Sequence, residues 1–310
     1  MNYNPILIVP GETKSIFFEI FFKSLKSKKY NSGIILICNK KILDKEIKRF
    51  NFRKKIELLN INKINLKNIK KNKIYILDVK KQNTKSYVLD CFDIAFKLIK
   101  SGFTNKLING PVDKSKTLNK KYLGITEYIS KKFNKKKFAM LIYNEKLSVS
   151  PITTHLPLKL VTRKISKKII EEKVNIINDF YKKFLQFKPR IAVVGLNPHC
   201  ESIHSFNEDQ RILLPAIQSL KKRVNIKGPF PADTLFLKKN RNKYDVIVGM
   251  YHDQVLTPIK TLFEYNAINI TLGLPFIRVS PDHGPNKSMV GKNKSSPISL
   301  IKALSFLDKR

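Results

Sequence analysis

Three of the five histidines each follow an apolar run that predicts a β-strand. The segments are residues 146–155 (KLSVSPITTH), 190–199 (RIAVVGLNPH) and 244–252 (YDVIVGMYH), which end at His155, His199 and His252. In an open parallel sheet, the loops that follow the strands form the ligand-binding edge. Three imidazoles delivered to that edge can bind a transition-metal ion and leave one coordination position for substrate. The long separations between these histidines match no compact ligand motif, so unrelated hydrogen bonds at three strand ends are the alternative.

Cationic side chains after other turns are candidates for holding phosphate or carboxylate. Lys114 follows a Gly-Pro-Val-Asp turn, Lys260 lies eight residues beyond His252, and Arg278 follows an apolar run. Because Lys is abundant in this chain, a lone Lys predicts exposed surface more than a binding site. Arg278 is more informative, since only nine of the 61 Lys and Arg residues are Arg and its neighbours are apolar.

Two acidic positions have both a chemical and a structural interpretation. Asp253, next to His252, can orient a metal ligand or act as a general base, and a plain turn residue is the alternative. In the run PADTLF at 231–236, we expect Asp233 or Thr234 to cap a helix rather than to act in catalysis.

The elements that must position these residues alternate between strand-like and helix-like segments, which predicts an α/β fold around a largely parallel sheet. A chain of 310 residues is long enough for one large domain or two smaller ones. Strands are predicted at 6–9, 33–38, 73–79, 106–109 and 268–272, and helices at 15–25, 87–99 and 166–187.

The net charge of +38 raises the question of a nucleic-acid partner. The positive excess lies outside the segments that contain the candidate residues, because 191–216 and 245–286 each contain more acidic than basic residues. We therefore interpret the lysines as a solvated surface and do not expect a nucleic-acid partner. The three cysteines are far apart and odd in number, and the chain shows neither a signal peptide nor a membrane-length apolar run. These features predict a cytoplasmic protein.

Several motifs together resemble 4-hydroxythreonine-4-phosphate dehydrogenase, a family of pyridoxal phosphate biosynthesis. From about 106 to 304 they read NGPVDK, TTHLPL, GLNPH, GPFPADTLF, MYHDQ, NITLGLPFIR and DHG, in the order of the family. The resemblance implies an isocitrate/isopropylmalate dehydrogenase-like fold, with two α/β/α domains and a cleft between them. The first domain would comprise 1–125 and 275–310, and the second, with the metal ligands and the dimer interface, 126–274. This fold binds NAD without the Gly-x-Gly-x-x-Gly fingerprint, which the sequence lacks.

The resemblance also implies roles for individual residues. His155, His199 and His252 are expected to bind a divalent metal, zinc first and cobalt or magnesium as alternatives, in a site shared by two subunits of a homodimer. The substrate-binding positions are Thr126, Lys260, Asn269 and Arg278, and the loop with Asp282, His283 and Gly284 is expected to bind NAD or NADP. Asp253 and Lys260 are the candidates for proton transfer.

The sequence departs from the family pattern at three places. The amino-terminal Gly-Asp-Pro-Ala-Gly-Ile-Gly-Pro-Glu motif is reduced to GETKSIFFE at 11–19, Ile125 replaces a substrate-contacting His, and Pro285-Asn286 replaces Thr-Ala. The expected reaction is oxidation of 4-phosphohydroxy-L-threonine at C3 with NAD(P), followed by decarboxylation to 3-amino-2-oxopropyl phosphate. Ile125 leaves open a sister dehydrogenase for another phosphorylated hydroxy acid, such as a four-carbon sugar acid phosphate. A basic nucleic-acid-binding protein on a degenerate enzyme scaffold is the alternative from another class.

Overall fold

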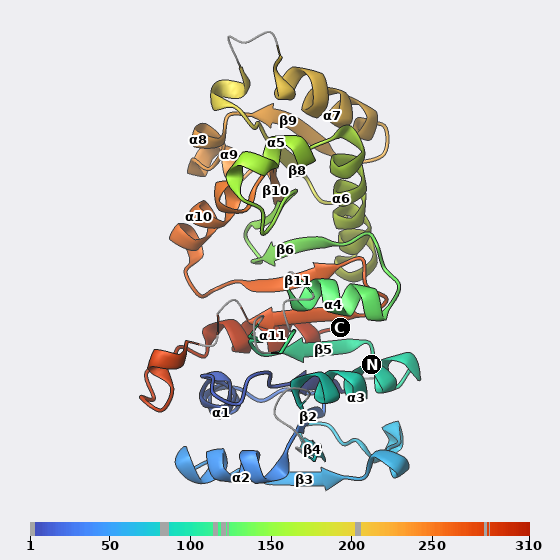
Figure 1. The fold of residues 1–310 in the computed structure, drawn as a ribbon, viewed down its shortest axis with the longest axis vertical. Coiled ribbons are helices and arrows are strands. Elements are labelled where there is room, and N and C mark those ends of the chain that lie inside the picture. Colours follow the sequence, from blue (N-terminus) through green and yellow to red (C-terminus); the bar gives the residue numbers. More distant parts are fainter. Residues whose placement is uncertain are drawn as a thin grey trace. The chain divides into compact units, whose positions relative to one another are not determined.

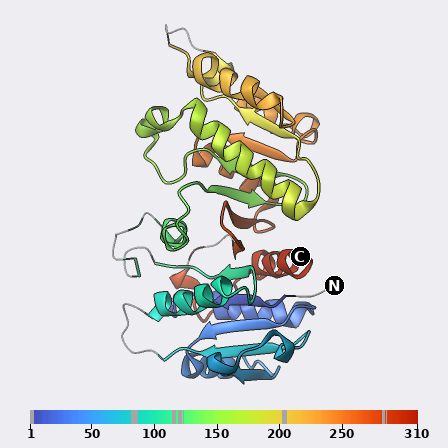
Figure 2. The same ribbon diagram turned by 90° about the vertical axis from the view of Figure 1, so that its right-hand side faces the viewer.

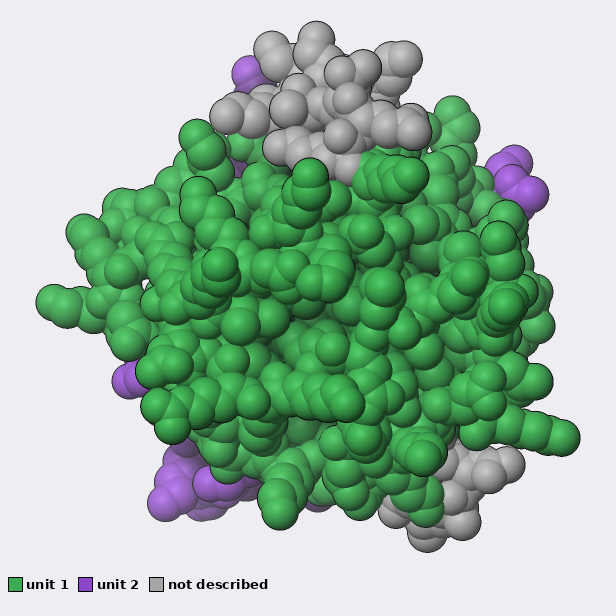
Figure 3. All heavy atoms as spheres, turned by 90° about the horizontal axis from the view of Figure 1, so that it is seen from below, with its two compact units in different colours: residues 1–133, 275–310 green, residues 134–274 purple. Residues whose placement is uncertain are grey.

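The chain divides into two compact units, each built from six strands and several helices (Figures 1 and 2). The computed structural model describes residues 4–80, 87–113, 117–118, 122, 124–201, 206–281, 284 and 286–310. Unit 1 comprises Met1–Phe133 and Pro275–Arg310 (Figure 3, green), so it contains the first and the last segment of the chain, and unit 2 is Asn134–Leu274. The candidates Lys114, Asp282 and His283 lie outside the described residues.

The strands of unit 1 pair in parallel. In spatial order they are β3 (Ile56–Leu59), β4 (Ile74–Asp78), β2 (Ile34–Cys38), β1 (Ile6–Val9), β5 (Lys106–Asn109) and β12 (Ile277–Pro281). The central strands are almost entirely Ile, Leu and Val and are fully buried, as expected for a parallel sheet.

The helices of unit 1 surround this sheet. They are α1 (Phe17–Ser27), α2 (Lys40–Arg49), α3 (Tyr87–Lys100), α4 (Ile125–Lys132) and α11 (Ile298–Asp308), with short 3-10 turns at Ile61–Lys63, Leu66–Asn68 and Lys287–Met289. Helix α3 contacts β1 and β2, while α11 contacts β12, β5 and β1 and packs against α1. The last segment of the chain therefore completes the core that the first segment begins.

The sheet of unit 2 is mixed. In spatial order its strands are β11 (Ile268–Leu272), β6 (Ala139–Tyr143), β7 (Ser148–Pro151), β10 (Val246–Gly249), β8 (Ile191–Val194) and β9 (Ile226–Phe230). Strands β7, β10, β8 and β9 are parallel, whereas β6 is antiparallel to both of its neighbours. The parallel part of this sheet supplies the edge at which ligands are expected.

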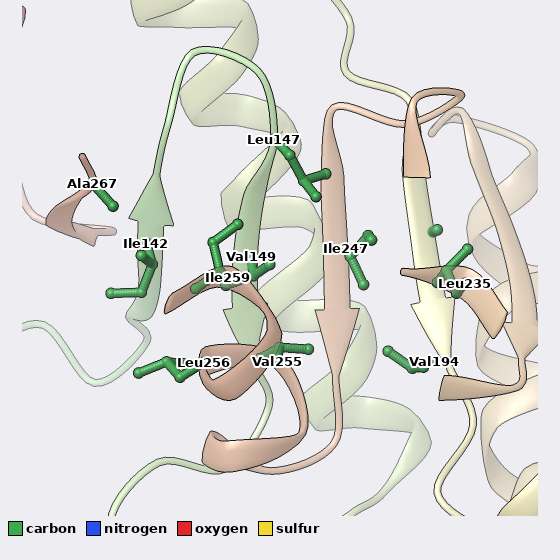
Figure 4. Packing of buried hydrophobic residues seen from close by; sticks show 11 residues of the cluster. Ile142, Leu147, Val149, Val194, Leu235, Ile247, Val255, Leu256, Ile259 and Ala267 are labelled. Atoms are coloured by element: carbon green, nitrogen blue, oxygen red, sulfur yellow. The ribbon is translucent and has the colours of Figure 1, made fainter. Parts of the chain in front are cut away.

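Helical segments flank both faces of the unit 2 sheet (Figures 1 and 4). They are η3 (Leu158–Leu160), α5 (Val161–Lys164), α6 (Lys167–Phe180), η4 (Tyr181–Leu185), η5 (Pro198–Cys200), η6 (Asp209–Leu213), α7 (Leu214–Lys221), α8 (Ala232–Leu235), α9 (Lys238–Arg241) and α10 (His252–Phe263). Helix α10 packs Val255, Leu256 and Ile259 into a buried cluster with Val149 of β7 and Ile247 of β10 (Figure 4). This packing fixes the first turn of α10, where His252 lies.

Most predicted elements are confirmed, and two expectations are wrong in detail. The strands at 6–9, 106–109 and 268–272 have the predicted bounds, and the predicted helix at 87–99 is α3. The helix predicted at 166–187 ends its α-helical part at Phe180 and continues as a π-helical turn to Leu185. Helix α8 begins after Pro231 without a side-chain cap, so the predicted capping role of Asp233 or Thr234 is wrong.

No helix in the described part of the chain is both long enough and apolar enough to span a membrane.

Candidate functional site

The three predicted histidines follow three neighbouring parallel strands of unit 2. Strand β10 pairs with β7 on one side and with β8 on the other. His155 follows β7, His199 lies in η5 after β8, and His252 is the first residue of α10 after β10. Because the strands are parallel, all three histidines lie at the carboxyl edge of one sheet, as the sequence predicts.

Hydrogen bonds tie the loop after β7 to the loop after β10. The Ile152 N–H donates to the Gly249 carbonyl at 2.7 Å. The N–H and the hydroxyl of Thr153 both donate to the Met250 carbonyl, at 3.1 and 2.8 Å. These bonds fix the backbone two residues before His155 relative to the backbone two residues before His252.

Gln254 ties the loop after β10 to the loop after β8. Its Oε1 accepts from the Met250 N–H at 2.7 Å, and its Nε2 donates to the Gly195 carbonyl at 2.7 Å. One side chain therefore uses both ends of its amide to join the loops that carry His252 and His199. A glutamine suits this position because it supplies a donor and an acceptor together.

His155 and His252 lie close together. Their ring centres are 5.9 Å apart, with an angle of 38° between the ring planes. Two imidazoles bound at 2.0–2.1 Å to one tetrahedral ion have ring centres about 5 Å apart. The observed separation of the two rings is similar to this value, so their proximity is compatible with a shared metal.

Asp253 lies beside the imidazole of His252. Its Oδ1 is 2.7 Å from His252 Nδ1. When Nδ1 carries the proton, this contact is an N–H···O bond that leaves Nε2 as the metal-binding nitrogen. The side chain of Asp253 is 81% exposed, so it also remains accessible for proton transfer.

The backbone at His199 has an unusual conformation. His199 and Cys200 have φ values of 55° and 62°, a left-handed region that few non-glycine residues adopt. The fully buried carboxylate of Asp209 accepts from the N–H groups of Leu196 at 2.7 Å and Asn197 at 3.0 Å. Asp209 thereby holds the turn that presents His199.

Gly195 allows this turn to pack tightly. A Cβ atom there would lie 2.5 Å from Cys200 Sγ and 3.0 Å from Asp209 Oδ1, which only a glycine avoids. Burial, followed by the charge of Asp209, raises the pKa of the Cys200 thiol to about 11. The thiol is therefore protonated at neutral pH, and Cys200 acts as a packing residue of the turn.

Within one chain, the three histidines do not close on a common centre. Among the described residues, which include all three, no group of three or more His, Cys, Asp or Glu side chains is arranged to hold a metal. The structure brings His155 and His252 together and leaves His199 on the next loop. The complete three-histidine site stays a prediction.

Arg278 provides a fixed cation in unit 1. It lies on β12 and is 3% exposed, and its Nε donates to Asn109 Oδ1 at 2.7 Å while its Nη1 donates to Thr126 Oγ1 at 2.8 Å. Burial lowers the pKa of Arg278 to about 10, and the charge of Glu127 opposes this shift. The guanidinium therefore remains charged at neutral pH. Thr126 and Arg278, both predicted to bind substrate, are in direct contact.

The loops after β1 and β5 form the carboxyl edge of unit 1 and are locked together. The Glu12 N–H donates to the Pro111 carbonyl at 2.9 Å, and Glu12 Oε1 accepts from the Asp113 N–H at 3.0 Å. A Cβ atom on Gly110 would lie 2.0 Å from the carbonyl oxygen of Pro10, so the two backbones touch.

Asp113 also links this edge to the segment after the predicted cofactor loop. Its Oδ2 is 3.1 Å from Lys287 Nζ, an ion pair within unit 1. Gly284 is the one predicted cofactor-binding residue within the described part of the chain. The cofactor-binding role of this loop stays a prediction.

Lys260 and Asn269 belong to unit 2, whereas Thr126 and Arg278 belong to unit 1. Lys260 lies in α10, about 12 Å along the helix from His252 at 1.5 Å per residue, and is half-buried. Asn269 lies on β11 opposite Ile142 of β6 and is also half-buried.

The sequence analysis missed Asn109, Asp209 and Gln254. Asn109 and Gln254 stand inside the quoted NGPVDK and MYHDQ motifs, which was the available signal for them. Asp209 lies in the polar run NEDQR, and nothing in that run predicts a buried carboxylate.

Comparison with known proteins shows the family of this chain. The sequence model of the family "Pyridoxal phosphate biosynthetic protein PdxA" matches residues 30–307. The chain belongs to this family. The match confirms the predicted family and the predicted class, an NAD(P)-dependent oxidoreductase.

Two curated relatives cover almost the whole chain. A 4-hydroxythreonine-4-phosphate dehydrogenase from Sulfurihydrogenibium sp. is 39% identical, over 97% of this chain and 96% of the relative. A D-threonate 4-phosphate dehydrogenase from Salmonella typhimurium is 31% identical, over 97% of both chains.

Solved structures confirm the predicted fold class. A 4-hydroxythreonine-4-phosphate dehydrogenase from Klebsiella pneumoniae superposes with a TM-score of 0.84 at 27% identity, covering 98% of this chain and 97% of the other. An isocitrate dehydrogenase from Methylococcus capsulatus, at 10% identity and a TM-score of 0.50, covers 98% of this chain and 84% of its own. This second likeness concerns the fold alone.

Proposed function

We propose that this chain oxidises 4-phosphohydroxy-L-threonine at C3 with NAD(P) and then decarboxylates the product to 3-amino-2-oxopropyl phosphate, in pyridoxal 5'-phosphate biosynthesis. The observation that carries the proposal is the placement of His155, His199 and His252 after three neighbouring parallel strands. The oxidoreductase family to which the chain belongs supports the choice of reaction. We further propose that the enzyme is cytoplasmic.

His155, His199 and His252 would hold a divalent ion, with zinc as the first candidate because neutral imidazoles suit it. When bound, such an ion lowers the pKa of a coordinated hydroxyl and stabilises negative charge on oxygen. We also propose a homodimer whose two subunits share this site.

Arg278 and Thr126 are proposed to bind the anionic end of the substrate. The bonds from Arg278 to Asn109 and Thr126 hold the guanidinium plane in one orientation before substrate arrives. An Arg held in this way is preorganised for a phosphate or carboxylate. In unit 2, Asn269 would contribute a hydrogen bond from its side-chain amide.

Asp253 or Lys260 is proposed to take the proton of the C3 hydroxyl. When bound, NAD(P) would supply the redox chemistry by accepting the hydride that leaves C3 as the C3–O bond becomes a carbonyl. The resulting β-keto acid then loses CO2 from the carboxylate on C2. The electron pair of the broken C–C bond forms an enolate, which is protonated at C2.

The decisive assay combines purified protein with 4-phosphohydroxy-L-threonine, NAD or NADP and a panel of divalent metals. Absorbance of the reduced cofactor and release of CO2 should rise together, and both should stop when a chelator is added. Reduced cofactor without CO2 would reject the decarboxylation step. Absence of both with every metal would reject the proposed reaction.

A sister activity on D-threonate 4-phosphate is the second candidate. The 31% identical relative with that name supports it, and so does Ile125, the first residue of α4, directly before Thr126. An apolar side chain offers no hydrogen bond to a polar substituent of the substrate. The ratio of kcat/KM for the two substrates decides between the activities.

The nucleic-acid-binding alternative makes a different prediction. It requires tight, salt-sensitive binding of RNA or DNA together with an absence of metal-dependent turnover. A filter-binding titration at two salt concentrations, alongside the assay above, tests it.

A further inference from the structure

A cavity of about 340 Å³ opens at the edge of unit 1 opposite to the edge described above. Its wall includes Ile34 and Ile74, the first residues of β2 and β4, which pair in parallel and in register. The loops with Glu12 and Asp113 follow the carboxyl ends of strands in the same sheet, whereas the cavity lies where strands β2 and β4 begin. None of the residues that line the cavity is one of the proposed catalytic residues.

The wall of the cavity is cationic. It contains four lysines and two hydroxyl side chains, namely Lys28, Lys29, Lys54, Lys73, Tyr30 and Ser32, which we call the lysine pocket. In the part of the chain that the structure describes, no acidic residue lines it. Leu25, Ile34 and Ile74 form its apolar part.

The positive charge of the lysine pocket is only partly neutralised. Lys73 pairs with Glu57 at 2.6 Å, and this hydrogen bond raises the pKa of Lys73, so that lysine is charged at neutral pH. Lys28 donates to the hydroxyl of Ser305 at 2.9 Å, and Lys54 donates to the Leu25 carbonyl. Both acceptors are uncharged, so they do not neutralise the two lysines. The wall therefore retains excess positive charge.

Two hydroxyl groups of the pocket residues lack hydrogen-bond partners among the described residues. Tyr30 is 3% exposed and Ser32 is fully buried, and neither Tyr30 OH nor Ser32 Oγ makes a hydrogen bond. Most buried polar groups in proteins are paired, because an unpaired group costs free energy. Burial, and then the charge of Asp308, raises the pKa of the Tyr30 phenol, which therefore stays protonated and able to donate.

A second carboxylate near the pocket residues, that of Asp308, is bound by backbone N–H groups. Asp308 accepts from the N–H groups of Asn31 at 3.0 Å and Ser32 at 2.7 Å, on the backbone between the two hydroxyl residues. Its charge is thereby compensated within the fold. In the described structure Asp308 forms no ion pair with a lysine of the pocket, and Glu57 pairs with Lys73 alone among these lysines.

We propose that the lysine pocket is a binding site for a small organic phosphate, separate from the catalytic residues. The lysines supply the charge that a phosphate dianion requires, and Tyr30 and Ser32 of the wall carry buried hydroxyls that have no partner among the described residues. The cavity is within the volume range of small-molecule sites, and its Leu and Ile side chains suit the carbon part of such a ligand. The proposal does not rest on the proposed function.

The test is calorimetric titration of the full-length protein with glycerol 3-phosphate at constant ionic strength, in the presence of a chelator. Two pocket variants are compared with the unmodified chain. Lys29→Gln/Lys73→Gln removes two exposed charges, and Tyr30→Phe/Ser32→Ala removes the two unpartnered hydroxyls. Because those hydroxyls make no hydrogen bond within the described structure, their removal is not expected to lower folding stability.

The control is Lys41→Gln/Lys45→Gln, which makes the same change of net charge on exposed residues of α2 in the same unit. We expect each pocket variant to weaken binding at one site by about tenfold or more, as loss of charge-assisted hydrogen bonds predicts, and the control to leave it unchanged. Equal weakening in the control would show a general surface attraction and overturn the proposal. Unchanged binding in both pocket variants would also overturn it.

Discussion

The carboxyl edges of the two units present their candidate residues in opposite ways. In unit 2, His155 and His199 are exposed and His252 is half-buried, and the loops beneath them are held by Asp209 and Gln254. In unit 1, Arg278 is itself buried and bonded directly to Asn109 and Thr126. Metal ligands must remain accessible to an ion, whereas a cation that binds one anionic group benefits from a fixed orientation. We therefore expect a substitution of a candidate residue in unit 2 to lower mainly activity, and one in unit 1 to lower both activity and stability.

The largest expected effect is on activity in unit 2. We expect His199→Ala to lower kcat/KM with 4-phosphohydroxy-L-threonine by about a thousandfold or more, because a lost metal ligand removes several kcal/mol of charge stabilisation. Folding stability should fall by at most about 1 kcal/mol, since His199 is exposed but alanine adopts its left-handed backbone conformation less readily. Initial rates of cofactor reduction, metal content and urea unfolding give the three measurements. A wild-type rate would remove His199 from the site.

Arg278→Lys in unit 1 should affect both properties. A lysine cannot keep the bonds to Asn109 and Thr126 together, so buried polar groups lose their partner at a cost of about 1–3 kcal/mol of unfolding free energy. We expect kcat/KM to fall about a hundredfold. Arg190→Lys is the control, because Arg190 forms an exposed pair with Asp245 and should lose at most about 1 kcal/mol. Equal losses in the two variants would contradict the contrast between the units.

Asp209→Asn tests whether the support beneath His199 matters. The amide keeps one acceptor oxygen but directs an NH2 group at a backbone N–H, which should disturb the turn at Leu196 and Asn197. We expect metal affinity to fall about tenfold to a hundredfold, as for other residues that orient ligands. Competition with a chromophoric chelator measures this affinity directly. Glu208→Gln is the matched control, because Glu208 contacts only the side chain of Asn197 in the described hydrogen bonds. An equal loss in that control would show that Asp209 has no special role.

The smallest effect concerns a second buried cation of unit 1. Lys106 is 1% exposed, its Nζ has no hydrogen-bond partner within the described structure, and burial lowers its pKa from 10.5 to about 8. Below about pH 8 the buried ammonium is charged, and Lys106→Met should stabilise the protein by about 1–2 kcal/mol. Between about pH 8 and 10.5 the amine is neutral in the native protein but still charged in the unfolded chain, so the gain decreases with rising pH. At about pH 10.5 it should be absent, because the amine then loses its proton in both states. Urea unfolding at pH 7 and at pH 10.5 measures it, with the exposed Lys97→Met as control. A gain that does not depend on pH would assign the effect to packing.

The contrast between Arg278 and Lys106 also shows what the sequence could not predict. Both are basic residues next to apolar strand residues, and they lie on paired strands, with Ile277 beside Lys106 and Arg278 beside Leu107. Only the structure shows that Arg278 has side-chain partners and that Lys106 Nζ has no hydrogen-bond partner among the described residues. Sequence spacing cannot predict this, since Asn109 and Thr126 are separated from Arg278 by more than a hundred residues.

Local sequence determined the strands that end near His155, His199 and His252, because apolar periodicity and strand-ending turns act over a few residues. The motifs, taken in order, also determined the family. The order of β7, β10 and β8 in the sheet was decided only by tertiary packing, and so was the burial of Asp209 and Arg278. Both depend on long-range contacts, whose partners no local pattern of the chain specifies.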